Sequence, residues 1–269
     1  MRAQRRGVAG HGRPLVLSRF DQPPTSMTSV RSARLRSVFL SWCVHAYTVT
    51  GVVLAVLIVM AAWEGDTRRA LWLGLVALVV DGTDGMLARR FKVRENIPWF
   101  DGAMLDNIVD YLTYAFAPMV MLWSNGYLGE GAPATVLTVV PLVASAYQFC
   151  RVDAKTDDHL FLGFPSYWNV VAFYIVVLGM QPFSVALLLV ICTVLVFVPI
   201  GYVYPSRTAT LRRVTLVLTA VWLVSYAVLL AQGSSPSPLW IGVSLGYLCY
   251  SVVVSLHLTV RRRRRASTR

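Results

Sequence analysis

The chain has 269 residues, of which 56% are hydrophobic and only 14% are charged, and its mean hydropathy is +0.59. A composition this apolar excludes an ordinary soluble enzyme and predicts a polytopic membrane protein. The formal net charge is +12, but the basic residues lie between apolar runs and at both ends, which fits an anionic lipid surface and argues against nucleic acid as a partner.

The first 36 residues carry eight arginines, several Pro and Gly residues, and no apolar run long enough for the core of a signal peptide. We therefore expect residues 1–36 to form a flexible, basic cytosolic tail, with Met27 as an alternative start of the chain. Residues 37–260 form the predicted membrane domain, and residues 261–269 form a second, polybasic tail. A basic run after a membrane helix fixes topology, and binding of anionic head groups is its alternative role.

Apolar runs of the length that a membrane-spanning helix needs, about 20 residues, recur along the domain. The prediction is an all-α membrane helix bundle with about eight transmembrane helices. The weakest division falls near Pro182, where a short break separates two runs and a tight turn is expected. The eight runs lie near 38–62, 68–89, 102–124, 133–150, 165–181, 183–203, 211–231 and 238–260.

The positions of the basic residues test this count through the positive-inside rule. With a cytosolic N-terminus, the inner segments hold 23 of the 25 Lys and Arg residues, and the outer loops hold only Arg68 and Arg69. With a wrong number of spans, the Lys and Arg residues would be distributed over both sides of the membrane. We therefore expect both termini in the cytosol and an integral protein of the cytoplasmic (inner) membrane.

Two rows of acidic and small residues stand at the second and third runs, each on one helix face. The first row is Asp81, Asp84, Gly85 and Ala88. The second row is Gly102, Asp106 and Asp110. A charged side chain inside the hydrocarbon costs at least about 2.5 to 3.5 kcal/mol, so these acids need pairing, hydration or bound cations. The alternative is a set of solvated helix-end charges at the cytosolic interface.

The donor type indicates which cations would bind. Carboxylate oxygens without nearby His or Cys suit hard divalent ions, Mn²⁺ or Mg²⁺, rather than zinc. Two such ions would clamp a diphosphate and leave one Asp free to act as a base. Because Gly85, Ala88 and Gly102 lack bulk, a nucleotide would lie close to the helix backbone there.

These positions, read as DxxDGxxAR, a spacer and GxxxDxxxD, resemble the signature of the CDP-alcohol phosphatidyltransferase family. The spacer, residues 90–101, has twelve residues where most of the family has eight. This length and three further stretches, 44–51, 156–169 and 203–207, are similar to the bacterial phosphatidylcholine synthases within that family. The resemblance covers about 36–260 and implies transfer of the phosphatidyl group of CDP-diacylglycerol to choline, with release of CMP.

The resemblance also implies roles for the acids. Asp81, Asp84 and Asp106 would hold two metal ions, and Asp110 would contact a metal and act as the catalytic base. A nucleotide site would include Gly85, Ala88, Arg89, Gly102 and Thr48. Arg89 would pair with a phosphate or anchor the helix at the interface. Thr48 would lie near the cytidine, or bond its own backbone, as Thr in membrane helices commonly does.

The chemical groups of the acceptor determine which residues would bind it. A quaternary ammonium cannot donate hydrogen bonds and binds best to aromatic faces. The candidates are Tyr111, Tyr114, Tyr147 and Trp168, with Tyr167 beside the last, and their alternative role is interfacial anchoring. A phosphorylated acceptor would instead need a basic pocket, for which the candidates are Arg151, Lys155, Arg207, Arg212 and Arg213.

Two other functions stay open at this point. One is the same chemistry with another alcohol: serine, inositol or glycerol phosphate. The other is a cation-coupled transporter, which predicts broken helices and inverted halves, and no such internal symmetry is visible. The expected partners are CDP-diacylglycerol, choline and membrane lipid, with a homodimer left open.

Overall fold

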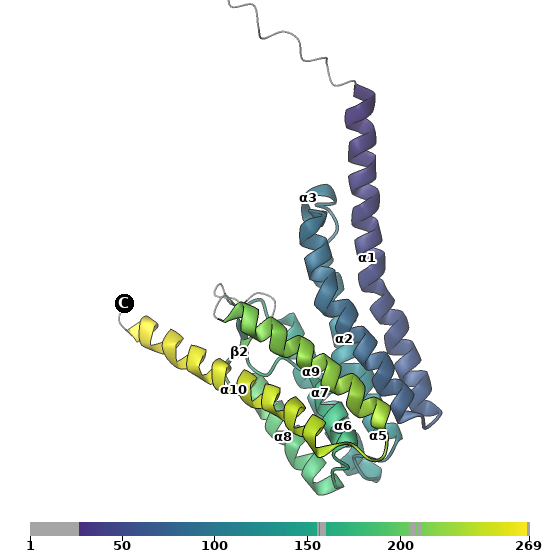
Figure 1. Cartoon of the computed structure of the whole chain (residues 1–269), viewed down its shortest axis with the longest axis vertical. Coiled ribbons are helices and arrows are strands. Elements are labelled where there is room, and N and C mark those ends of the chain that lie inside the picture. The colour runs from purple at the N-terminus through teal and green to yellow at the C-terminus, as the bar shows by residue number, and fades with distance from the viewer. Residues whose placement is uncertain (1–26, 155, 157–159, 205–207, 209–210, 268–269) are drawn as a thin grey trace, which may run out of the picture.

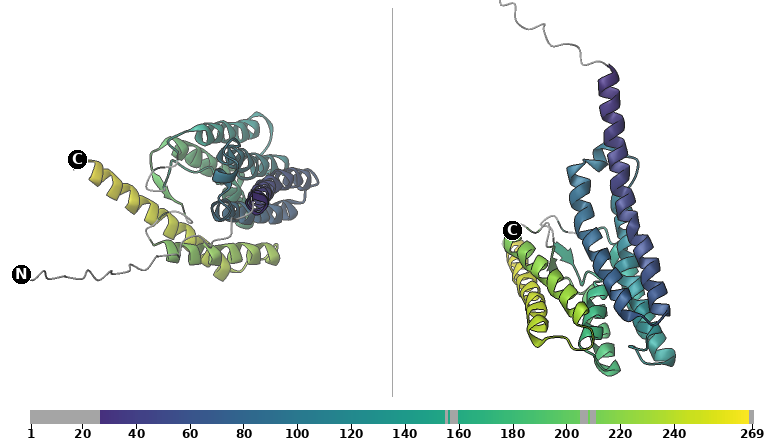
Figure 2. Two further views of the ribbon diagram at one scale, coloured as in Figure 1. Left: turned by 90° about the horizontal axis from the view of Figure 1, so that it is seen from above. Right: turned by 45° about the vertical axis from the view of Figure 1, so that its right-hand side comes forward.

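The structure is a computed structural model that describes residues 27–154, 156, 160–204, 208 and 211–267. A long antiparallel pair, α1 (Met27–Trp63) and α2 (Thr67–Arg90), stands side by side in Figures 1 and 2. The short helix α3 (Val93–Asn96) follows. The third apolar run continues through α4 (Gly102–Asp110), the π-helix η1 (Tyr111–Phe116) and α5 (Ala117–Ser124).

The second half of the described chain contains five helices and two strands. The helices α6 (Gly131–Cys150) and α7 (Trp168–Val177) pack beside α5 and η1, and α8 (Pro182–Phe197) packs against α6. The last two helices, α9 (Arg212–Gln232) and α10 (Pro238–Ser267), form a second antiparallel pair. Figure 1 shows the C-terminal part of α10 leaving the body of the bundle.

Five described helices are long and apolar enough to cross a membrane, which makes the chain a helical membrane bundle. They cover Arg31–Trp63, Thr67–Arg90, Gly131–Cys150, Arg212–Gln232 and Pro238–Arg264. The other three predicted runs are also helical, but one is interrupted by η1, and α7 and α8 have only 10 and 16 residues. The helices therefore follow the order of the predicted runs, while the count of eight spans remains a prediction.

Acidic caps fix where two of the helices begin. The Asp66 side chain accepts a hydrogen bond of 2.9 Å from the backbone N–H of Arg69 at the start of α2. Asp101 accepts bonds of 3.0 Å from the N–H groups of Ala103 and Met104 at the start of α4. Because an Asp cap satisfies otherwise unpaired N–H groups, it determines the register of the helix that follows. Asp101 thereby sets the position of the second row of acids.

The π-helix lies directly after Asp110, in the middle of the third run. Pro118, in the first turn of α5, has no backbone N–H and cannot donate to the residue four positions before it. The regular α pattern therefore cannot pass unchanged through this point. Short π segments inside α-helices occur frequently at functional sites.

A two-stranded antiparallel sheet joins segments that are distant in sequence. The strands β1 (Leu160–Leu162) and β2 (Gly201–Val203) pair in a register that sets Leu160 opposite Val203. Side chains of α10 complete the backbone bonding of β2, since Gly201 N–H donates to Thr259 Oγ1 at 2.8 Å and Val203 N–H donates to Ser255 Oγ at 3.1 Å. This small sheet is an addition to the all-α expectation.

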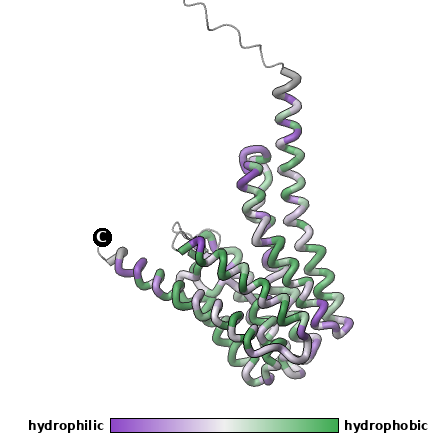
Figure 3. The backbone as a smooth tube through the Cα atoms, in the orientation of Figure 1, coloured by the Kyte–Doolittle hydropathy of each residue, from purple (hydrophilic) through white to green (hydrophobic). Residues whose placement is uncertain are grey.

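The two predicted tails differ from the expectation where the structure describes them. The helix α1 begins at Met27, so residues 27–36 are helical rather than flexible, and residues 1–26 lie outside the described part. Likewise α10 continues through the basic run to Ser267. Figure 3 shows hydrophilic residues at α3 and at the C-terminal end of α10, and hydrophobic residues through the body.

Candidate active site

The two acids of α2 each receive a hydroxyl hydrogen bond from a different element. Asp84 is buried, with 5% of its surface exposed, and its Oδ2 accepts a bond of 2.8 Å from Thr48 Oγ1 of α1. Asp81 Oδ2 accepts a bond of 2.6 Å from the Tyr114 hydroxyl of η1. Donors to a carboxylate stabilise its charged form and fix its orientation. Both side chains are therefore held before any ligand binds.

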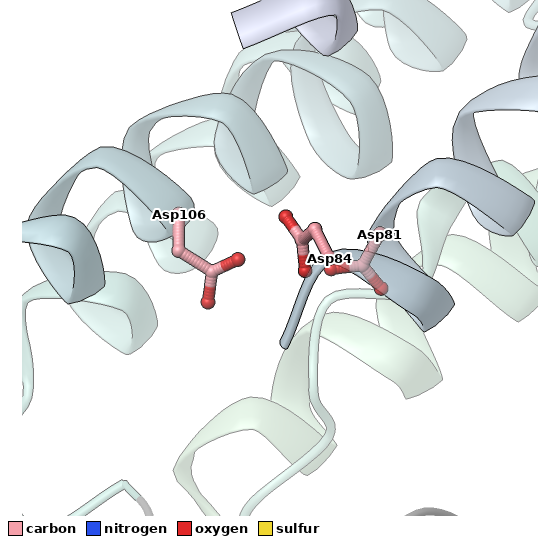
Figure 4. Close-up of side chains that lie close together, drawn as sticks. All are labelled: Asp81, Asp84 and Asp106. Atoms are coloured by element: carbon pink, nitrogen blue, oxygen red, sulfur yellow. The ribbon is translucent and has the colours of Figure 1, made fainter. Parts of the chain in front are cut away.

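Asp106 of α4 completes an acidic triad with Asp81 and Asp84. One carboxylate oxygen from each of the three residues lies within 4.8 Å of the other two, and Figure 4 shows their carboxylates lying close together. Three negative charges this close in an apolar bundle repel one another unless cations lie between them. The all-oxygen donor set fits Mn²⁺ or Mg²⁺, as the sequence predicts, and Asp81, Asp84 and Asp106 would be the ligands.

Asp110 lies outside this triad but lines the same small pocket. The pocket lies between α1, α2, α4 and η1, and its lining also includes Thr48 and Thr113. Since Asp110 follows Asp106 by four residues on α4, it stands one turn further along the same face. The four predicted acids thus share one pocket, and three of them form the tight group.

Glycines let α1 approach the helices that carry the acids. A Cβ at Gly51 would collide with the side chain of Val109 of α4, so the Val109 side chain packs directly against the α1 backbone there. A Cβ at Gly102 would lie 2.7 Å from Cε1 of His45. Within the described residues, the buried His45 Nε2 has no hydrogen-bond partner. The imidazole packs instead on the Phe100 ring of the twelve-residue spacer, with centroids 4.6 Å apart.

The predicted nucleotide residues form a strip that leads away from the triad. Thr48 contacts Asp84 directly, while Gly85, Ala88 and Arg89 continue along α2. The Arg89 side chain is exposed and lies close to Gly85, where an added Cβ would be 3.3 Å from Nη1. Small residues and one exposed cation on this strip leave room for a phosphate-bearing ligand.

Only one of the four predicted acceptor residues contacts the triad. Tyr114 reaches Asp81, whereas Tyr111 points to α6, where its hydroxyl lies 3.5 Å from the Leu142 carbonyl oxygen. Tyr147 is half exposed and packs on Phe197, with centroids 5.2 Å apart.

Trp168 requires a correction to the predicted acceptor set. Its side chain has no exposed surface, and Nε1 donates a bond of 2.6 Å to Ser145 Oγ. A fully buried ring with a satisfied N–H cannot offer a face to a substrate, so Trp168 belongs to the core. The apolar pattern around Trp168 fits a core position and an acceptor site equally well, so the sequence did not separate them.

Tyrosines from four distant segments gather around Tyr167, and two of them, Tyr204 and Tyr247, were not among the predicted candidates. The Tyr167 ring packs on the Tyr114 ring, with centroids 5.7 Å apart. Tyr204 and Tyr247 lie in the neighbourhood of Tyr167. Tyr204 and Tyr247 carry no local signal, because only the packing of the sheet and α10 brings them to this place.

The predicted basic pocket for a phosphorylated acceptor is not assembled in the described residues. Arg151 forms an ion pair of 2.8 Å with Asp153, and this hydrogen bond holds the pKa of the Asp153 carboxyl below its ordinary value. Arg212 and Arg213 are exposed at the start of α9. Lys155 and Arg207 lie outside the described residues. The charge of Arg151 is therefore already balanced.

Known proteins resemble this chain over most of its length, although no family model matches it. It is 33% identical to the phosphatidylcholine synthase of Borreliella burgdorferi over 85% of this chain and 98% of that protein. It is 36% identical to the phosphatidylcholine synthase of Pseudomonas aeruginosa, covering 88% of this chain and 96% of the relative. It is also 36% identical to that of Legionella pneumophila, covering 84% and 91%.

Proposed function

Because the chain belongs to the phosphatidylcholine synthase family, we propose that it transfers the phosphatidyl group of CDP-diacylglycerol to choline and releases CMP. The single observation that carries this proposal is the acidic triad, Asp81, Asp84 and Asp106, held by hydroxyls from two other elements inside a membrane bundle. Such a group of carboxylates inside a membrane bundle is costly without bound cations, and divalent cations there would bind the diphosphate of the substrate.

In the proposed reaction, the hydroxyl oxygen of choline attacks the phosphorus of the phosphatidyl group. The bond from that phosphorus to the oxygen of CMP breaks, and CMP leaves with the electron pair. Asp110 accepts the hydroxyl proton as the new bond forms, which is the role of a general base within reach of the nucleophile. Its place in the pocket beside the triad supports this assignment.

Two Mn²⁺ or Mg²⁺ ions, held by Asp81, Asp84 and Asp106 with Asp110 beside them, would supply charge neutralisation for the diphosphate and for the leaving CMP. The chain's own contribution is to hold these oxygens in place. Thr48 and Tyr114 each donate to one carboxylate oxygen and leave its other oxygen available as a ligand. Gly85, Ala88, Arg89 and Gly102 would accommodate the nucleotide along α2 and α4.

The proposed topology has eight spans with both termini in the cytosol, so that the pocket opens toward the cytosolic face of the inner membrane. The partition of Lys and Arg supports it, since all but Arg68 and Arg69 fall on one side. In this orientation CDP-diacylglycerol reaches the site from the bilayer, and choline reaches it from the cytosol. Residues 37–260 make up the proposed catalytic domain.

The direct test supplies the purified chain in lipid nanodiscs with CDP-diacylglycerol, Mn²⁺ and one alcohol at a time. We expect CMP release with choline, and little with serine, inositol or glycerol phosphate. CMP release with another alcohol and none with choline would keep the reaction class and overturn the acceptor.

A further inference from the structure

Tyr167 stands at the centre of a tight, strained turn. The backbone N–H of Trp168 donates to the carbonyl of Ser166 at 2.8 Å, and Tyr167 between them has φ −76° and ψ 55°. These values define an inverse γ-turn. Ser166 itself has φ 59°, a left-handed conformation that costs free energy for a residue with a side chain. Strain of this kind persists only where the surroundings enforce it, and it points to function.

The residues around the turn enforce this geometry. On one side, Trp168 is fully buried and tied to Ser145 of α6. On the other side, the backbone N–H of Phe164 donates to the Leu195 carbonyl of α8 at 2.9 Å. The turn is thus attached to two helices, which fixes the position of the Tyr167 backbone.

The Tyr167 ring lies beside the acids. It packs on Tyr114 with an angle of 43° between the ring planes, and the Tyr114 hydroxyl donates to Asp81. Asp81 and Asp110 both lie in the neighbourhood of Tyr167. A group bound on this ring would therefore lie next to the proposed base.

The small sheet and α10 supply two more tyrosines. Tyr204 follows β2 directly and packs on Phe161 of β1, with ring centroids 4.7 Å apart. Tyr247 of α10 is fixed by a hydrogen bond of 2.9 Å between its hydroxyl and Thr219 Oγ1. Both lie in the neighbourhood of Tyr167. Four tyrosines from four separate segments therefore form a cluster around Tyr167: Tyr114, Tyr167, Tyr204 and Tyr247.

We propose that this tyrosine cluster is the subsite for the trimethylammonium group of the acceptor, with the Tyr167 ring as its main face. Methyl groups on the cation cannot accept or donate hydrogen bonds, so electron-rich ring faces are the groups that bind it. Two carbons separate the choline nitrogen from its hydroxyl oxygen. A cation on Tyr167 would therefore hold that oxygen near Asp110, which is the positioning that the transfer requires. This inference rests on the proposed function and assigns its acceptor subsite.

The test compares Tyr167→Leu and Tyr167→Phe in nanodiscs, with choline varied at saturating CDP-diacylglycerol. Loss of the ring in Tyr167→Leu should raise the KM for choline about tenfold, within the range of one cation–π contact. Tyr167→Phe keeps a ring face, so an increase of about twofold is expected. The KM for CDP-diacylglycerol should stay within twofold in both variants. Tyr127→Leu, in the turn after α5, is the matched control for loss of a tyrosine elsewhere.

An uncharged acceptor separates charge from shape. In 3,3-dimethylbutan-1-ol a tert-butyl group replaces the trimethylammonium group. The wild-type enzyme should prefer choline over this alcohol, and Tyr167→Leu should lose about tenfold of that preference. An equal effect on both alcohols would show that the ring contributes only shape and would overturn the cation site.

The remaining outcomes are also decisive. An unchanged choline KM in a folded Tyr167→Leu variant would overturn the subsite while the proposed function stands. No turnover of choline by the wild-type enzyme would instead overturn the proposed function. If Tyr167→Leu does not fold, Tyr204→Leu gives the same comparison, because Tyr204 lies at the end of the sheet rather than in the strained turn.

Discussion

Thr48 Oγ1 of α1 donates a hydrogen bond of 2.8 Å to Asp84 Oδ2 of α2, in the buried space between the helices of the first antiparallel pair. The Val44 carbonyl oxygen, 3.4 Å from the same hydroxyl, is the more distant acceptor. The hydroxyl therefore supports the acid rather than only its own backbone. The first helix thus takes part in the active site through a residue that is not itself an acid.

Thr48→Val should weaken the metal site without unfolding the bundle. Valine keeps the shape of threonine and loses the bond to Asp84, and loss of such a supporting bond typically costs 10- to 100-fold in metal affinity. The Mn²⁺ concentration for half-maximal CMP release should rise by about that factor. Thr50→Val is the matched control, because the exposed Thr50 hydroxyl bonds only the Tyr47 carbonyl. Equal Mn²⁺ requirements in the two variants would contradict this role of Thr48.

Asp106→Asn should abolish most activity and leave the protein folded. The substitution removes a metal ligand, so we expect kcat to fall at least about 100-fold. Removing one of three close charges also relieves repulsion, so the thermal unfolding temperature should not decrease. The control is Asp101→Asn, since Asn caps a helix as well as Asp does and the α4 start is preserved. A variant Asp106→Asn that unfolds would assign the residue a structural role instead.

Asp110→Asn should separate binding from transfer. The variant keeps the triad, so CDP-diacylglycerol should still bind in the presence of Mn²⁺. Loss of a general base typically costs 10²- to 10⁴-fold in rate, so transfer to choline should fall by that amount. Binding is measured by displacement of labelled CDP-diacylglycerol, and transfer by CMP release. Substantial turnover in this variant would remove Asp110 from the chemistry.

The acids were predictable from sequence because helical periodicity alone places them. Spacings of three and four residues put Asp81 with Asp84, and Asp106 with Asp110, on single faces. The structure confirms that Asp81, Asp84 and Asp106 meet. The order of the helices was predictable for a similar reason, since long apolar runs must be helical in a membrane.

The acceptor side was less predictable because it depends on contacts between distant segments. The turn at Tyr167 is held in place by hydrogen bonds to α6 and α8. No residue of that turn is a glycine that would have marked it in the sequence. The sheet is completed by Thr259 and Ser255, about 50 residues away from β2. Local propensity carries no information on such pairings, so Trp168 and Tyr167 could not be told apart from sequence.

Gly102→Ala tests whether the glycine makes room for His45 or for the nucleotide. The added methyl group would lie 2.7 Å from His45 Cε1, and overpacking of this kind costs about 1–3 kcal/mol. The thermal unfolding temperature of Gly102→Ala should therefore lie below that of the wild type. In the His45→Ala background, adding Gly102→Ala should leave the unfolding temperature almost unchanged, because the clashing ring is gone. A raised KM for CDP-diacylglycerol that persists in the double variant would point to nucleotide contact at Gly102.

Competition among alcohols shows most directly whether choline is the acceptor at the triad. Choline, serine, inositol and glycerol phosphate are supplied together at equal concentration with CDP-diacylglycerol and Mn²⁺, and the lipid products are resolved by mass. We expect phosphatidylcholine to be the dominant product, and we expect Asp106→Asn or chelation of the metal to remove it. A dominant product from another alcohol would contradict choline as the acceptor. Phosphatidylcholine formed at full rate without a divalent ion would contradict the metal site.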